Sequence, residues 1–179
     1  MKKLQKGDEK SFTQIYDLYV DKIYRFVFLK TSSRETAEEI VQDVFMRFWK
    51  FAQDNENTVK SISAVLYQTA RNLVIDYYRS IGRKESTVLL EDNLIPDKTA
   101  DADTDIQKDI DIEYSLQEVE NALKLLPEKY KDIIIMKFIN ELSSKEIAQA
   151  LNKQEGNVRV LVHRALATLK KSIKENPQV

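Results

Sequence analysis

Cysteine is absent from this chain of 179 residues, which also contains one histidine, 3 glycines and 3 prolines. Without cysteine, the chain cannot form a disulfide or use thiolate chemistry. It offers no glycine-rich loop to cradle a phosphate, and no convincing set of metal ligands. We therefore expect no catalytic residue, no metal and no cofactor, and the scarcity of glycine and proline favours long helices with few tight turns.

Long apolar runs are missing as well. No stretch approaches the roughly 20 apolar residues that a membrane-spanning helix needs, and the segment from Met1 to Asp8 lacks the apolar centre of a signal peptide. Hydrophobic residues make up 42% of the chain and charged residues 32%, so the chain can build cores and stay in solution. We expect a cytoplasmic protein that does not insert directly into a membrane.

The net charge of -1 hides an uneven distribution of charge. Residues 1–90 carry 15 basic and 12 acidic residues, residues 91–113 carry 2 and 9, and residues 114–179 carry 11 and 8. A strongly acidic stretch without a clear apolar face is typical of a linker. We predict an all-α protein with a helical domain over residues 1–82, a flexible acidic linker over 83–113 and a second helical domain to the end.

Three helices are predicted in the N-terminal domain, over residues 10–30, 33–53 and 61–80. The first carries an aromatic stripe, including Phe12 and Tyr16, that is most simply core. Ser32 and Glu35 have the spacing of a capping box before the second helix. That helix has the most regular apolar pattern of the chain, made by Ala37, Ile40, Val41, Val44, Phe45, Phe48 and Trp49.

The opposite face of the second helix carries Glu39, Gln42 and Asp43. Like charges one turn apart cost a little helix stability, so this pairing of acids needs an explanation. The face is either a solvated charged surface or a docking surface for a basic partner.

The second half of the third helix mixes aromatic and charged residues, namely Arg71, Asn72, Asp76, Tyr77, Tyr78 and Arg79. Aromatic rings beside positive charge suit unstacked single-stranded bases, each stacking contact being worth roughly 1–3 kcal/mol. The alternative is that one tyrosine belongs to the core and the arginines are solvated. The pattern alone leaves both possibilities open.

A helix-turn-helix is predicted between Glu141 and Lys171. Ser143 and Glu146 form a capping box at the start of its first helix. Asn152 follows the last apolar residue, where a left-handed residue commonly ends a helix. Gly156 permits a turn, and Asn157 can cap the helix that follows. Pro127 suits the first position of a preceding helix.

The second helix of this motif has an apolar face and a basic face. Between Val158 and Lys174 there is no acid, and the basic residues are Arg159, Arg164, Lys170, Lys171 and Lys174. Such a helix can lie in the major groove of DNA. An ordinary helical hairpin with a solvated basic face gives the same pattern.

Order and spacing together resemble one known family. Ala37 to Phe45, which reads AEEIVQDVF, resembles the core-polymerase-binding helix of bacterial group IV (extracytoplasmic function) RNA polymerase sigma factors. Leu66 to Arg79 resembles the family's segment for recognising and opening the minus-ten promoter element. Leu126 to Leu169 resembles its domain for the minus-thirty-five element. The resemblance covers nearly the whole chain except the linker.

The resemblance implies a non-enzymatic sigma factor that directs promoter recognition, DNA opening and the initiation of transcription. Its partners would be core RNA polymerase, through the β and β′ subunits, promoter DNA and an anti-sigma factor. It assigns polymerase docking to Glu39, Gln42 and Asp43, and minus-ten DNA to Asn72, Asp76, Tyr77 and Arg79. It assigns the minus-thirty-five DNA face to Glu155, Asn157, Arg159, His163 and Arg164.

The chain departs from the family pattern at four positions. Val65 stands where a tryptophan is common, and Lys153 where the turn usually has an apolar residue. Val160 and Leu161 replace positions that are commonly polar or basic. These departures leave the promoter sequence undetermined.

Three other functions compete with this interpretation. A helix-turn-helix regulator acting without a polymerase holoenzyme is the first alternative, although the N-terminal helices show no alternating βα pattern of a receiver domain. A helical adaptor would leave the acid-free basic helix unexplained. An enzyme is the least supported, because His163 is better read as a polar-face residue than as a catalyst.

Overall fold

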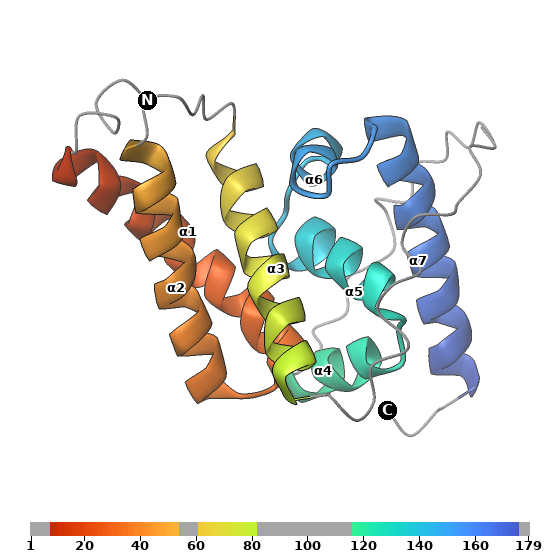
Figure 1. Cartoon of the computed structure of the whole chain (residues 1–179). Coiled ribbons are helices and arrows are strands. Elements are labelled where there is room, and N and C mark those ends of the chain that lie inside the picture. Colours follow the sequence, from red (N-terminus) through yellow and green to blue (C-terminus); the bar gives the residue numbers. More distant parts are fainter. Residues whose placement is uncertain (1–7, 54–60, 82–115, 176–179) are drawn as a thin grey trace.

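The computed structural model describes residues 8–53, 61–81 and 116–175, and this part of the chain is helical, as the predicted all-α class requires. The elements are α1 (Glu9–Thr31), α2 (Arg34–Gln53), α3 (Ile62–Ile81), α4 (Leu116–Lys124), α5 (Glu128–Ile134), the π-helix η2 (Ile135–Ile139), α6 (Ser144–Ala150) and α7 (Glu155–Glu175). Figure 1 shows α1 to α3 forming one half of the molecule and α4 to α7 the other. The predicted linker lies outside the described residues.

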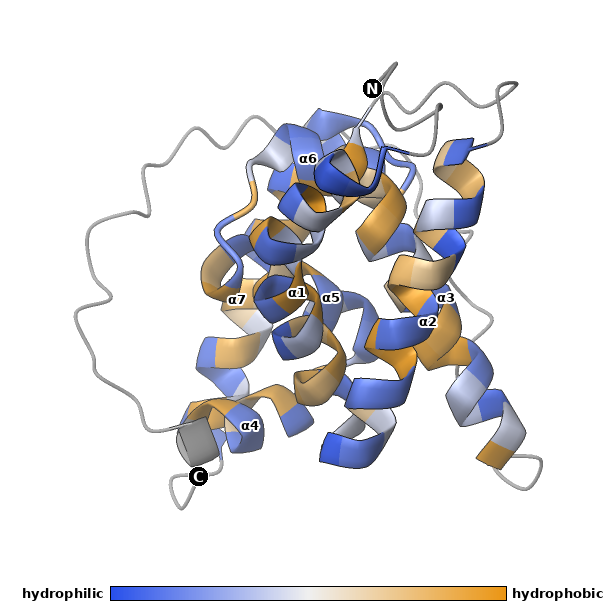
Figure 2. Ribbon diagram, turned by 90° about the vertical axis from the view of Figure 1, so that its left-hand side faces the viewer, coloured by the Kyte–Doolittle hydropathy of each residue, from blue (hydrophilic) through white to orange (hydrophobic). Residues whose placement is uncertain are grey.

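The N-terminal half is a three-helix bundle in which each helix packs against the other two. Hydrophobic and hydrophilic residues occupy different sides of its helices (Figure 2). The predicted stripe of α2 is buried, except that Trp49 is only partly covered. At the centre, the fully buried Tyr67 meets the edge of Phe26, with ring centroids 5.4 Å apart. Because the apolar stripe of α2 packs against α1 and α3, the opposite side of α2 faces solvent.

The start of the aromatic stripe on α1 is less buried than predicted. Tyr16 is 39% exposed, although its ring centroid lies 4.7 Å from that of Phe45. Phe12 is partly buried and packs on Trp49 at the same centroid distance. The N-terminal end of the stripe is therefore only partly covered by the bundle, and Tyr16 is not a core residue.

The C-terminal half is built around α5, α6 and α7. Pro127 occupies the N-cap of α5 and is not its first helical residue, a difference of one position from the prediction. The helix α5 continues directly into η2, which ends where the Asn140 amide donates to the Ile135 carbonyl over 2.9 Å. The core of this half is formed by Leu123, Leu126, Ile133, Ile147, Val158, Leu161 and Ala165.

Two of the predicted signals in the helix-turn-helix are confirmed. The Ser143 side chain accepts from the Glu146 amide over 3.2 Å, and Glu146 accepts from the Ser143 amide over 2.9 Å. Asn152 has a φ of 52°, so it supplies the left-handed residue after α6. The sequence prediction of this helix start and stop was therefore correct.

Two other local predictions were wrong by one or two residues. Ser32 is the left-handed end of α1, with a φ of 52°, and Ser33 instead accepts from the Thr36 amide over 3.3 Å. At the other end of the chain, α7 already begins at Glu155, so Gly156 and Asn157 lie inside its first turn. An acid at the first position of a helix is favoured by the helix dipole, which explains this earlier start.

Candidate functional site

The exposed side of α2 carries the three residues predicted to bind polymerase. Glu39, Gln42 and Asp43 are all exposed, and they lie opposite the buried stripe of the same helix. Residues three and four apart are neighbours on a helix surface, so the three side chains form one patch. We call it the α2 acidic face. It offers two carboxylates and an amide to a basic partner.

Met46 extends the α2 acidic face and was missed from the sequence. It is 55% exposed and comes one turn after Gln42. The signal was present, because Met46 is apolar yet falls outside the apolar stripe of its helix. A single exposed apolar side chain is ordinary on a protein surface, so Met46 enlarges the α2 acidic face without identifying a partner by itself.

The four residues predicted to act on minus-ten DNA lie at the end of α3, on two different sides of the helix. Asn72 and Asp76 are exposed and one turn apart, and Arg79 reaches back to Asp76 over 3.6 Å. Tyr77 lies on another side of α3, where its hydroxyl accepts a hydrogen bond from Thr36 Oγ1 over 3.3 Å. The structure therefore brings three of the four residues together and turns the aromatic ring toward α2.

Tyr78 is also tied to a neighbouring helix. Its hydroxyl donates to the Lys30 carbonyl at the end of α1, and its ring meets that of Tyr77 with centroids 5.4 Å apart. Burial, followed by the nearby Glu128 carboxylate and Tyr77, raises the pKa of Tyr78. Both tyrosines are thus anchored through their hydroxyl groups, while Tyr78 remains 37% exposed.

The five residues predicted to face minus-thirty-five DNA are all exposed on α7, and the buried residues of that helix lie on its opposite side. Arg159 donates to Glu155 over 2.9 Å, so two of the five predicted residues form an exposed ion pair with each other. Lys170, Lys171 and Lys174 are also exposed. From Arg159 to Lys174 the basic side of α7 extends for about 22 Å at 1.5 Å per residue.

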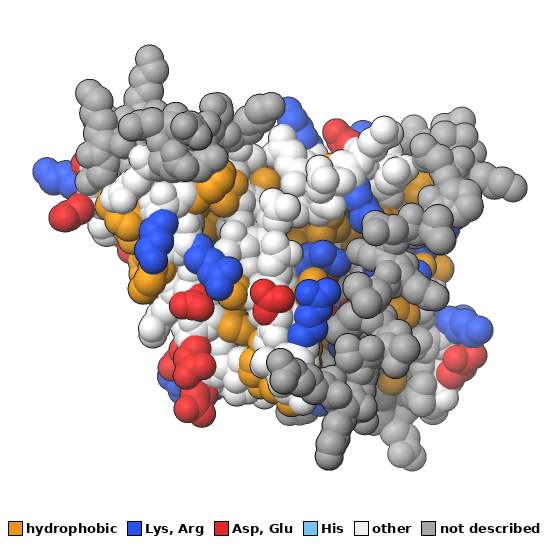
Figure 3. All heavy atoms as spheres, viewed as in Figure 1, with side chains coloured by type: hydrophobic (Ala, Val, Ile, Leu, Met, Phe, Trp, Pro, Cys, Tyr) orange, Lys and Arg blue, Asp and Glu red, His pale blue; other side chains and the backbone are white. Residues whose placement is uncertain are grey.

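The four residues that depart from the family pattern differ in their burial and surroundings. Leu161 is buried and Val65 is partly buried, so both act as packing residues. Val160 is half-buried on α7. Lys153 lines a small hollow with Arg71 and Lys129. Figure 3 shows Lys and Arg side chains on the surface where the N-terminal and C-terminal halves meet. With about 20 Å³ the hollow has room for little more than a water molecule.

In the part of the chain that the structure describes, no group of three or more histidine, cysteine, aspartate or glutamate side chains could hold a metal ion. None of the described helices combines the length and the apolar character needed to cross a bilayer. The surfaces on α2, α3 and α7 are therefore the candidate sites of this part of the chain.

Two family models match the chain, one in each half. The model of sigma-70 region 2 matches residues 15–84, and that of sigma-70 region 4 matches residues 116–169. The first range contains the surfaces on α2 and α3, and the second contains the helix-turn-helix.

Curated relatives match over nearly the full length. The ECF RNA polymerase sigma factor SigW of Bacillus subtilis is 30% identical, over 98% of this chain and 95% of its own. SigM of the same organism, also an ECF RNA polymerase sigma factor, is 29% identical over 88% of this chain and 91% of its own.

Two solved structures show the same fold. CnrH, solved with the cytosolic domain of CnrY, matches with a TM-score of 0.70 and 19% identity over 97% of this chain and 94% of its own. The sigma factor RpoE of Bartonella quintana, solved with the anti-sigma factor NepR, matches with a TM-score of 0.66 and 24% identity over 93% and 99%. The two halves, their order and the full-length relatives lead to one conclusion: the chain belongs to the extracytoplasmic function (ECF) RNA polymerase sigma factors.

Proposed function

We propose that this sigma factor divides its work among three exposed surfaces. The α2 acidic face docks on core RNA polymerase, the end of α3 acts on the minus-ten element, and the basic side of α7 binds the minus-thirty-five element. The observation that carries this proposal is that the predicted side chains lie on the solvent side of helices whose other sides form the cores. Tyr77, which is turned toward α2, is the exception.

The domain assignment follows from the same division. We propose that residues 1–82 form the polymerase and minus-ten domain and that residues 114–179 form the minus-thirty-five domain, joined by the acidic linker. A regulator that works without polymerase is not favoured, because both halves of the chain match sigma-factor regions. Sigma factors in general are not enzymes, and we assign no catalytic residue.

An anti-sigma factor is the third proposed partner, beside core polymerase and promoter DNA. RpoE, one of the structural relatives, was solved with the anti-sigma factor NepR. Since the proposed work takes place on polymerase and promoter DNA, we also propose that the protein acts in the cytoplasm.

Polymerase capture tests the docking surface. We expect the charge reversal Asp43→Lys, and more strongly the triple change Glu39→Lys, Gln42→Ala and Asp43→Lys, to weaken binding to core polymerase. Loss of one partner of a buried charge pair costs roughly 2–5 kcal/mol. Asp17→Lys is the matched control, because Asp17 is an exposed acid on α1. Unchanged capture of the folded triple variant would reject the assignment of this face.

A further inference from the structure

Sulfur is scarce in this chain, and its methionines differ in exposure. The sequence contains no cysteine and 3 methionines, which are Met1, Met46 and Met136. Met136 belongs to η2 and is 0% exposed, whereas Met46 on α2 is 55% exposed. Met1 lies outside the described residues. In the part of the chain that the structure describes, Met46 is therefore the one exposed methionine.

Exposure decides which methionine an oxidant reaches first. Hydrogen peroxide transfers one oxygen atom to a thioether sulfur, so the sulfur is oxidised to a sulfoxide while the peroxide is reduced to water. No bond of the protein breaks, and no proton is released. Because the sequence has no cysteine, no thiolate of this chain competes for the oxidant. Solvent reaches Met46 and not Met136, so Met46 should react first.

Met46 lies on the surface that is proposed to dock on core polymerase. It follows Gln42 by four residues and Asp43 by three, which makes it the neighbour of both on the exposed side of α2. The buried stripe of α2 lies on the opposite side of the helix. Oxidation of Met46 therefore changes the α2 acidic face while the core of the bundle keeps its packing.

The surroundings of Met46 combine charged and apolar groups. Trp49, one turn farther along α2, is partly buried and packs against Phe12 with ring centroids 4.7 Å apart. Figure 3 shows hydrophobic side chains beside acidic and basic ones on the surface over α2. The centre of a protein interface is commonly apolar within a polar rim, and methionine is enriched there. Docking through this face should therefore remove the Met46 side chain from water.

Oxidation changes what the Met46 side chain contributes to such a contact. A thioether is apolar and flexible, whereas a sulfoxide is polar and carries an oxygen that accepts hydrogen bonds. Removing an apolar side chain from water stabilises a contact, but burying a polar oxygen without a donor opposes it. The sulfoxide should therefore weaken the docked state and leave the free chain folded.

We propose that Met46 is an oxidation site that controls how tightly the chain binds core polymerase. The inference rests on the proposed function, because it requires the α2 acidic face to dock on polymerase. Oxidation of Met46 lowers the affinity about tenfold, which is of the order expected for one methionine that becomes buried on binding. Methionine sulfoxide reductases reverse the change, because they reduce the sulfoxide back to the thioether.

Peroxide treatment of the full chain tests this site. The free chain is treated with hydrogen peroxide, the peroxide is removed with catalase, and peptide mapping by mass spectrometry locates the added oxygen. We expect Met46 to be oxidised well before Met136. Capture of the treated chain on untreated core polymerase should require about tenfold more protein. Reductases for both sulfoxide epimers should restore the original capture.

Two variants assign the effect to one sulfur atom. Met46→Leu has an apolar side chain without sulfur, so its capture should be the same before and after peroxide, whatever its starting level. Met136→Leu keeps a similar volume in the core and should respond to peroxide as the native chain does. Circular dichroism of the treated chains should remain helical, because Met46 lies outside the core.

Protection by polymerase gives an independent measurement. If docking covers Met46, its oxidation should slow when the chain is bound to core polymerase before peroxide is added. The rate is read from the same peptide map, with a chain that has never met polymerase as the reference. An unchanged rate on bound polymerase would show that the sulfur stays exposed and would overturn the proposal.

Three other results would also overturn the oxidation site. They are equal oxidation rates for Met46 and Met136, unchanged capture of a chain with fully oxidised Met46, and a peroxide effect that persists in Met46→Leu. Failure of the docking surface gives a different result, namely normal capture of the triple variant at Glu39, Gln42 and Asp43. If the triple variant loses capture but oxidation has no effect, only the oxidation site is rejected.

Discussion

Thr36 Oγ1 donates a hydrogen bond to the Tyr77 hydroxyl over 3.3 Å, which ties the end of α3 to the first turn of α2. The ring of Tyr77 is half-buried as a result. A residue held in this way either supports the bundle or presents the edge of its ring to DNA. The two roles predict different behaviour when the hydroxyl or the whole ring is removed.

Tyr77→Phe should transcribe normally from a duplex promoter, because only one half-buried hydrogen bond is lost, worth roughly 1 kcal/mol of folding free energy. Asn72→Ala combined with Tyr77→Ala should bind polymerase but transcribe poorly from duplex DNA. A template mismatched at the minus-ten element should restore activity, since unpairing and unstacking, which cost a few kcal/mol, have been removed. Run-off transcription on both templates measures this. Equal impairment on both would indicate a structural role for Tyr77.

Arg159 and Arg164 should affect promoter capture instead. Loss of a phosphate contact lowers the salt slope of binding by about 1 and weakens all sequences alike, whereas loss of a base contact relaxes specificity at one position. We expect at least one of these outcomes for Arg159→Ala and Arg164→Ala on minus-thirty-five DNA, measured across salt concentrations. Lys124→Ala, an exposed base on α4, is the control. Native affinity and salt slope in both arginine variants would exclude this orientation of α7.

The start of α6 should make stability depend on pH. Hydrogen bonding from the Ser143 backbone is the main reason that the pKa of Glu146 lies below its usual value, although partial burial opposes it. A lowered pKa means that the charged form stabilises the fold fully above the usual glutamate pKa of about 4.3. This contribution is lost as the pH falls from that value toward the lower pKa of the folded state.

Glu146→Gln should therefore be less stable than the native chain at pH 7, with the difference shrinking below about pH 4.3. Ser143→Ala, which removes the cap, should cost about 1 kcal/mol. Urea unfolding followed by circular dichroism at both pH values measures these effects, with Glu141→Gln as the control for an exposed acid. A difference that stays constant with pH would show that the charge of Glu146 does not contribute.

Local patterns predicted much of the architecture. The helical spacing of apolar residues identified α2 and its buried side. The residues from Ala37 to Phe48 form one continuous apolar face, and such a face packs against the rest of the protein. The Ser143 capping box worked because both of its bonds form within four residues. The error at Ser32 had a similarly local cause, since two adjacent serines compete for one cap and the helix end selects between them.

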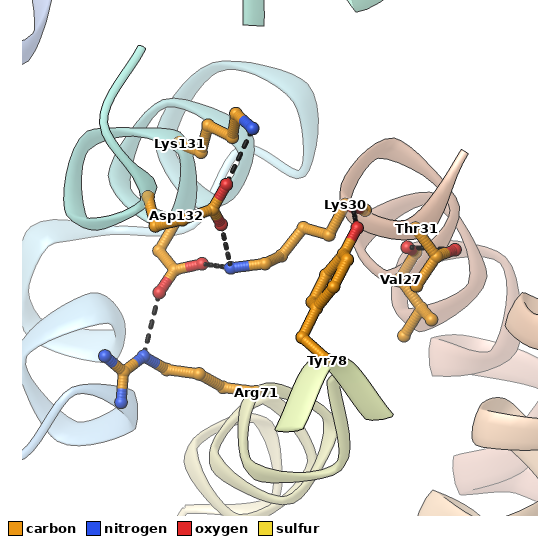
Figure 4. Close-up of polar contacts among 8 residues, drawn as sticks. Val27, Lys30, Thr31, Arg71, Tyr78, Lys131 and Asp132 are labelled. Carbon is orange, nitrogen blue, oxygen red and sulfur yellow. Dashed lines mark hydrogen bonds and ion pairs between the residues drawn. The ribbon is translucent and has the colours of Figure 1, made fainter. Parts of the chain in front are cut away.

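The contact between the two helical halves could not be predicted in the same way. Lys30 and Asp132, which form the ion pair shown in Figure 4, are separated by 102 positions in the chain, and nothing in the sequence around Lys30 distinguishes it from a solvated lysine. The full burial of Tyr67 was not predicted for a related reason. Its ring on α3 is covered by residues of another helix, including Phe26 on α1. Residues whose burial depends on distant partners require the three-dimensional arrangement.

Tyr67 provides a last test of how the interior is held together. Its hydroxyl and Asn140 Oδ1 are the two buried side-chain polar atoms of the described residues that lack a hydrogen-bond partner. Burial is the main cause that raises the pKa of this phenol well above its usual range. A buried hydroxyl without a partner costs folding free energy, so its removal should be neutral or stabilising.

Tyr67→Phe should therefore leave the free energy of unfolding unchanged or raise it, because the ring still packs against Phe26 and an unpartnered buried hydroxyl is removed. Tyr67→Ala should cost about 3–5 kcal/mol, since it opens a cavity in the bundle. Urea unfolding of the full chain compares the two variants. A loss of about 1 kcal/mol or more in Tyr67→Phe would show that the phenol donates to Asn140, and that the hydroxyl helps to join the two halves.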